Sequence, residues 1–197
     1  MSTTTLYAEL VVIGTGAAIF VLVLFYCLTG DSSWFTRLGG LSSLGSAAAL
    51  IPGLSIIYLL GVINTNVGYL LFKWPENWLR RQALSKSKHK YDLIKNNVYI
   101  SQHHELIEDF HFRRSKIRIC RGWFINSLLI LFALIKGVGN GYIEPFMAKF
   151  SIIAMGLLMI ATGVSWWAAT DTELRELRFF DPSVPESKTF CYCKLGF

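Results

Sequence analysis

Residues 113–135 read RRSKIRICRGWFINSLLILFALI, a basic run that passes directly into an apolar one. The apolar part, from Gly122 to Ile135, has about 14 residues, which a helix extends over roughly 21 Å. A bilayer core is about 30 Å thick, so this helix must either continue through Lys136 or cross a thinner region. The stretch predicts a membrane-spanning helix with positive charge gathered at one end.

Three further stretches are apolar enough to span a bilayer. They run from Leu6 to Leu28, from Leu50 to Phe72 and from Phe146 to Ala169. The first lacks the basic start and small-residue cleavage site of a signal peptide, so we expect a retained anchor in which Glu9 reaches the headgroups. In the second, Pro52 and Gly53 predict a kink or a helix start.

The composition supports this interpretation. The chain of 197 residues is 53% hydrophobic and only 16% charged, and its mean hydropathy is +0.44. These values exclude an ordinary soluble domain. The expected fold class is all-α: a polytopic membrane protein with four transmembrane helices, arranged as two hairpins with a basic helical loop between them.

The basic residues predict the orientation. Of the 19 Lys and Arg residues, 12 lie between Lys73 and Arg121, whereas residues 29–43 hold only Arg37 and residues 137–145 hold none. Because cytoplasmic loops retain positive charge, the basic loop and both termini are expected in the cytoplasm, where thiols stay reduced. The expected parts are a first hairpin (1–72), the loop (73–121), a second hairpin (122–170) and a tail (171–197).

Helices are also expected outside the spans. Pro75 suits the first turn of an interfacial basic helix that follows the second span. Ser101 can cap another helix that runs into the third span, with Phe110 and Ile117 on its apolar stripe. The fourth helix is expected to continue past Asp171 and to stop before Pro182.

Five basic residues form the main candidate for binding a partner or an anionic ligand. They are Arg113, Arg114, Lys116, Arg118 and Arg121. Such a cluster can orient the chain and bind anionic lipids, or it can form a pocket for a nucleotide, a nucleic acid or an acidic protein surface. The sequence leaves these readings open, since it has no glycine-rich phosphate loop.

Burying a polar residue inside a membrane span costs free energy unless the side chain is hydrogen-bonded or in contact with water. Asn64 and Asn66 lie in the second span and Asn126 lies in the third. They are expected either to hydrogen-bond across the bundle or to line a pore. The string Gly137 to Tyr142 looks superficially like a potassium selectivity filter, but its position after the third span predicts an ordinary turn.

Small residues recur along the spans and favour close helix packing. Ala154, Ala161 and Ala168 share one line of the fourth span, and the first two spans contribute Gly14 and Gly61. Helices in lipid pack closely through such faces, within one chain or between copies. We expect a homo-oligomer.

No pattern in the sequence indicates catalysis. His104, Glu108 and His111 fall on one helical face, but the HExxH signature is absent. The spans show no arrangement of a nucleophile with a general base. We therefore expect no enzyme activity, no cofactor and no metal.

The four spans, the basic loop and the short tail resemble the small membrane components of bacterial anti-phage defence systems of the Kiwa type, over the whole chain but in architecture only. The resemblance implies a homo-oligomeric sensor or scaffold in the bacterial inner membrane, which recruits or controls a soluble cytoplasmic effector. The alternative is a ligand-gated ion channel or a membrane-disrupting effector.

Overall fold

The computed structural model describes residues 3–30, 33, 46–83 and 104–179, which form four long helices. α1 covers Thr3–Thr29, α3 covers Ser46–Ala83, α5 covers His104–Gly139, and α6 covers Pro145–Phe179. Each of them contains a stretch long and apolar enough to cross a membrane. The secondary structure of the described residues is therefore all-helical, and the four helices indicate a multi-pass membrane protein, as predicted from the sequence.

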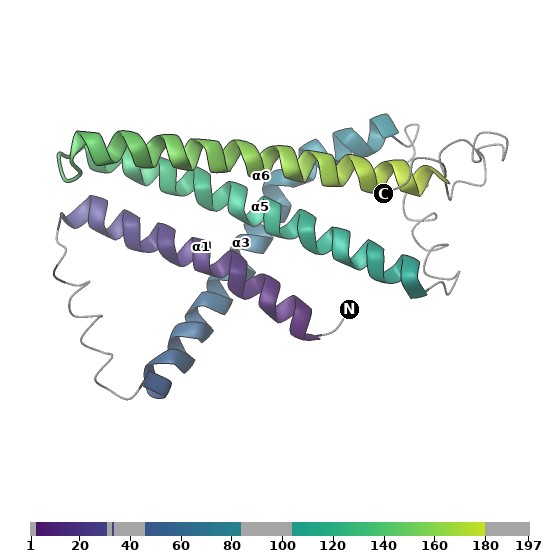
Figure 1. Ribbon diagram of the computed structural model, residues 1–197, viewed down its shortest axis with the longest axis horizontal. Coiled ribbons are helices and arrows are strands. Elements are labelled where there is room, and N and C mark those ends of the chain that lie inside the picture. The colour runs from purple at the N-terminus through teal and green to yellow at the C-terminus, as the bar shows by residue number, and fades with distance from the viewer. Residues whose placement is uncertain (1–2, 31–32, 34–45, 84–103, 180–197) are drawn as a thin grey trace.

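Three of the helices lie side by side, and the fourth crosses them. In Figure 1, α1, α5 and α6 follow the long axis of the molecule with α5 in the middle, while α3 crosses them steeply. α5 and α6 run in opposite directions along each other. α1 and α3 meet at a crossing and then diverge. The end of the bundle where α1 and α5 begin and α3 and α6 end is called the arginine end below.

All four helices extend beyond the predicted spans, and the extensions of α3 and α5 bear on the expected layout. α3 passes through both Pro52 and Pro75, so the separate interfacial helix predicted at Pro75 is instead the last part of α3. Phe72 and Leu79, on either side of Pro75, are buried in the core, and this packing compensates for the hydrogen bond that proline cannot make. α5 runs unbroken from His104 past Lys136 to Gly139, which makes the third span long enough.

A tight turn joins α5 to α6 and also holds the end of α1. Gly141 has a φ of 73°, a left-handed conformation that glycine adopts without strain. The Asn140 side-chain amide donates a hydrogen bond to the carbonyl of Cys27 at 3.2 Å, and the Tyr26 hydroxyl donates one to the carbonyl of Tyr142 at 3.1 Å. The glycine-rich string is therefore a turn, as predicted, and it links three helices.

Aromatic side chains fill the contact between α3, α5 and α6. The Phe72 ring meets Trp166 edge-on with centroids 4.7 Å apart, and it meets Phe124 edge-on at 5.4 Å. Ile117 and Leu174 are buried in the same cluster. Edge-to-face pairs of this kind stabilise beyond their buried area, so this cluster fixes how α3 sits on the α5–α6 pair.

Glycines bring the backbones of α1 and α3 into direct contact. A methyl group added to Gly14 would overlap the carbonyl oxygen of Ile57, and one added to Gly61 would overlap that of Leu10. Small residues permit such close approach. The predicted small-residue faces of α1 and α3 are thus used inside one chain.

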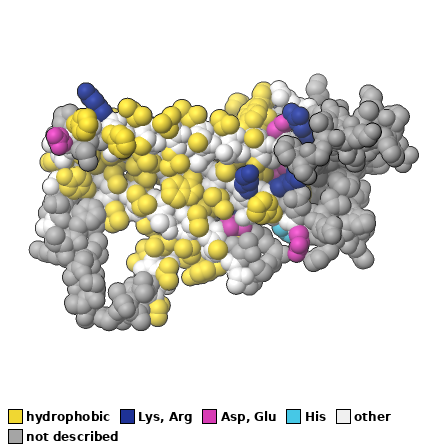
Figure 2. Space-filling view, in the orientation of Figure 1, with side chains coloured by type: hydrophobic (Ala, Val, Ile, Leu, Met, Phe, Trp, Pro, Cys, Tyr) yellow, Lys and Arg dark blue, Asp and Glu magenta, His cyan; other side chains and the backbone are white. Residues whose placement is uncertain are grey.

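The alanine line of α6 has a different environment. Ala154, Ala161 and Ala168 are exposed in the single chain, together with Phe150 and Leu157. Figure 2 shows hydrophobic side chains over the middle of the visible face and charged ones toward its two ends. An exposed apolar belt between charged ends is typical of a surface that faces lipid or other helices in a bilayer.

We expect Gly61→Ala to destabilise the protein by about 1–3 kcal/mol, the range for overpacking a tight contact. Gly53→Ala is the matched control, because the same helix leaves open space around Gly53. Thermal unfolding in mild detergent, followed by circular dichroism, measures both. Equal melting temperatures for the two variants would contradict the crossing.

Candidate functional site

Three arginines of α5 reach the three other helices at the arginine end. We call these residues and their carboxylate partners the arginine layer. The pairs are Arg118 with Glu9 of α1 at 2.8 Å, Arg121 with Glu76 of α3 at 3.2 Å, and Arg114 with Glu173 of α6 at 3.6 Å. The spacings of four and seven place the arginines on one side of α5. One face of one helix thus ties all four helices together.

The pair between Glu9 and Arg118 is the most deeply buried carboxylate contact of the layer. The Glu9 side chain is only 4% exposed, whereas Arg118 is 31% exposed. The Nε of Arg118 also donates a hydrogen bond to Glu9 Oε2, at 2.9 Å. The sequence predicts that Glu9 reaches outward to the headgroups. In the structure the side chain is instead buried and paired with the guanidinium of Arg118, because a buried carboxylate requires a partner.

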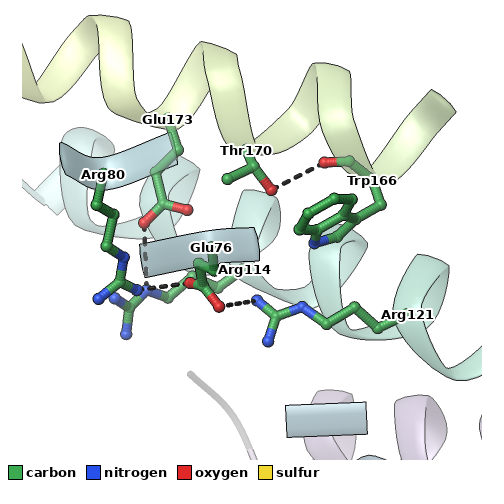
Figure 3. Close-up of polar contacts among 7 residues, drawn as sticks. All are labelled: Glu76, Arg80, Arg114, Arg121, Trp166, Thr170 and Glu173. Carbon is green, nitrogen blue, oxygen red and sulfur yellow. Dashed lines mark hydrogen bonds and ion pairs between the residues drawn. The ribbon is translucent and has the colours of Figure 1, made fainter. Parts of the chain in front are cut away.

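Glu76 lies between two arginines. One carboxylate oxygen accepts a hydrogen bond from Arg80, one turn further along α3, and the other forms an ion pair with Arg121 of α5. Both Glu76 and Arg121 are 12% exposed. Figure 3 shows this pair beside the Trp166 ring, with Arg114 and Glu173 on its other side. The second and third pairs of the layer therefore lie next to each other, and Arg80 belongs to the second through Glu76.

The five predicted basic residues separate into two groups. Arg114, Arg118 and Arg121 point into the layer, and Arg114 also lies over the Phe110 ring at 4.7 Å. Lys116 is exposed and Arg113 is half-buried. The three inward arginines form ion pairs with glutamates of neighbouring helices, whereas the exposed Lys116 side chain is placed to meet a ligand or a partner directly.

An asparagine pair joins α1, α3 and α5 deeper in the bundle. The Asn64 amide donates to Asn126 Oδ1 at 2.8 Å and to the Gly122 carbonyl at 3.3 Å. The Asn126 amide donates to the Ile13 carbonyl at 3.0 Å. Asn126 is completely buried. Asn66, the third predicted polar residue, is exposed and lies outside this network.

The residues that share a helical face in the sequence, His104, Glu108 and His111, are described only in part. No group of three metal-ligating side chains occurs among the described residues. Glu108 is exposed and His111 is half-buried. The His104 side chain lies outside the described set, so the expectation that this trio holds no metal stays a prediction.

The glutamates of the layer were missed by sequence reasoning. Glu9 is the only acidic residue in its apolar span, and Glu76 and Glu173 flank two others. A lone acid in an apolar span calls for a cationic partner. That rule could have pointed from Glu9 to the arginine cluster, although not to Arg118 in particular.

Comparisons with models of protein families, with curated proteins and with solved structures find no match.

We expect Arg118→Gln to cost about 3 kcal/mol or more, because it leaves Glu9 charged and buried without this partner. Glu9→Gln should cost less, since the partly exposed Arg118 can turn toward water. The double variant should recover part of the loss. Thermal unfolding in detergent measures this cycle.

The control for this cycle is Arg175→Gln, which removes an exposed pair with Asp171. Exposed pairs contribute about 0–1 kcal/mol, so its melting temperature should stay near that of the parent protein. If the two arginine variants behave alike, or if the cycle shows no coupling, the layer does not hold the helices together.

Proposed function

We propose that this chain is a non-enzymatic sensor or scaffold of the bacterial inner membrane, with both termini and residues 84–103 in the cytoplasm. It assembles as a homo-oligomer and recruits or controls a soluble cytoplasmic partner. The proposed context, defence against phage, comes from the architectural resemblance described above.

The observation that carries the proposal is the use of the buried polar groups. The amides of Asn64 and Asn126 are engaged with each other and with backbone carbonyls, inside a contact that buries both side chains. A water-filled path needs polar groups that face open space. Groups engaged in this way serve helix packing, which supports a scaffold over a pore within one chain.

The arginine layer supplies a physical basis for sensing. Each other helix is held to α5 through a charged contact at the same end. Moving any one of them in the bilayer therefore alters a contact of α5. α5 extends beyond the layer toward His104, into the region assigned to the cytoplasm. A shift in helix packing can thus reach a surface that a soluble partner meets.

The partner surface is proposed on this extension of α5. Phe112 is 69% exposed and Lys116, one turn away, is also exposed. An aromatic side chain beside a cation suits an acidic protein surface, since aromatic and charged groups can contribute affinity and orientation together. Anionic lipid headgroups are expected to neutralise the remaining basic charge nearby.

A channel is the second candidate, and one observation favours it. Asn66 is exposed on α3 within a helix that is otherwise apolar enough to span a membrane. A polar side chain that faces lipid is costly. Several copies of the chain arranged around one axis would instead place Asn66 in a water-filled pore between them. Such a pore would form between chains.

We expect a photo-reactive amino acid at Phe112 to cross-link a soluble protein in cells that carry the native operon. The same group at Phe150, which is exposed in the apolar middle of the chain, should cross-link only membrane components. Mass spectrometry of the adducts measures both. Adducts of identical composition at the two positions would contradict the proposed partner surface.

Ion flux into liposomes tests the channel at the same time, with the oligomeric mass measured in the same preparation. The sensor proposal expects a defined oligomer without conductance. A selective conductance that Asn66→Leu abolishes would favour the channel instead.

A further inference from the structure

The two parts of α3 on either side of its crossing with α1 differ sharply. Residues 51–56, which we call the free arm, are almost entirely exposed: Ile51 is 69% exposed, Ile56 is 61% exposed, and nothing lies within 4 Å of a methyl group added to Gly53. In Figure 1 this part of α3 projects away from the other helices. It packs against none of them closely.

The other part of α3, residues 68–80, is held firmly and is called the bound arm. Phe72 and Leu79 are buried in the aromatic core, and Glu76 belongs to the arginine layer. The Gly68 backbone lies close to Ile125 of α5. These anchoring contacts come from α5 and α6.

Between the arms, α3 crosses α1 at a close contact. At Gly14 and Gly61 the backbones of the two helices touch without intervening side chains, and the Tyr7 and Tyr58 rings of the same helices stack with centroids 5.1 Å apart. Asn64 adds two directed hydrogen bonds to α5 close to this point. Ridges of large side chains that fit into grooves set the crossing angle of a helix pair. At the two glycines no side chain interlocks with the other helix, which makes this the point about which α3 can turn.

We infer that α3 is a lever that pivots on the Gly14–Gly61 crossing and converts bilayer thickness into a change at the arginine layer. The inference rests on the proposed sensor function and names its moving part. The free arm is the input, because no other described helix packs closely against it. The bound arm is the output, because it carries Glu76 to Arg121.

Bilayer thickness acts on this helix for a geometric reason. Its apolar part, residues 51–72, is 22 residues long, or about 33 Å of helix at 1.5 Å per residue, against a hydrocarbon core of about 30 Å, which is thinner still in short-chain lipids. A helix longer than the bilayer accommodates by tilting, so its tilt follows the thickness. α5 and α6 are packed along each other, whereas the free arm of α3 has little packing to lose.

The output follows from the position of Glu76. If α3 rotates about the crossing, the bound arm shifts against α5, and the distance between Glu76 and Arg121 changes. Two partly buried charges cannot separate freely, since an unpaired one is costly. The ion pairs of the arginine layer must therefore either rearrange together or keep α3 in place. The layer thus separates two packing states of the helices, and α3 passes from one to the other only when these pairs rearrange.

Distances between spin labels in bilayers of different thickness test the lever. Labels on noncanonical amino acids leave the native cysteines intact, and dilution with unlabelled protein removes distances between copies. One pair joins Ile51 on the free arm to Phe132 on α5, a second joins Trp74 on the bound arm to Phe112 on α5, and a reference joins Phe132 to Phe150 on α6. All five side chains are exposed.

Passing from short-chain to long-chain phosphatidylcholine should shift the distance distributions of both α3 pairs by several ångström and leave the reference pair unchanged. Arg121→Gln should enlarge the shift at both α3 pairs, because it releases the bound arm. Arg175→Gln, which removes an exposed pair on α6, should leave the shift as it is.

Two results would overturn the lever. Unchanged α3 pairs in every bilayer would mean that the crossing does not rotate, and equal shifts in all three pairs would mean that the whole bundle tilts as one body. Either result leaves the cross-linking at Phe112 as a separate test. A recruited partner with an immobile α3 would retain the sensor and remove only the lever, whereas a moving α3 without a partner would do the reverse.

Discussion

The pairing of one arginine face of α5 with a glutamate from each other helix is the constraint on which the rest of the structure depends. A charge taken out of water must meet an opposite charge, or its burial costs several kcal/mol. Arg114, Arg118 and Arg121 meet this requirement with carboxylates from three different helices. The register of all four helices at the arginine end is therefore set by one face of α5.

The remaining contacts divide the work of holding the bundle. The asparagine pair fixes α1 and α3 against α5 with directed hydrogen bonds. The glycine crossing lets the backbones approach, and the aromatic cluster around Phe72 fills the space between α3, α5 and α6. Apolar burial drives helices together only weakly in lipid, so polar and close-packed contacts carry the specificity. The same division leaves the free arm of α3 with little packing against the other described helices.

The sequence was informative about elements that depend on local pattern. Hydropathy located the four helices, and the glycine-asparagine string after α5 was correctly predicted as a turn. The helix through Pro75 was predicted wrongly, because burial of Phe72 and Leu79 outweighs the local effect of proline. The steep crossing of α3 has no local signature. Gly14 and Gly61 indicate close helix packing, but they predict neither which helices cross nor the crossing angle.

The candidate site was predictable in its residue types and unpredictable in its pairings. Positive charge at the start of the third span and asparagines within the spans were evident from the sequence, yet residue spacing along one helix does not say which other helix faces it. Arg118 and Glu9 are 109 residues apart. The same limit applies to Asn66, which lies two residues from Asn64 but on an exposed face.

The central claim is that the polar interior is closed and structural. Hydrogen exchange of the asparagine side-chain amides in lipid nanodiscs, followed by NMR on protein labelled at asparagine, tests it most directly. The Asn126 amide should exchange at least about a hundredfold more slowly than that of an unstructured asparagine, because exchange there requires opening of the packed helices. Exchange of Asn126 at the unstructured rate would show that water reaches the pair, and it would contradict the account.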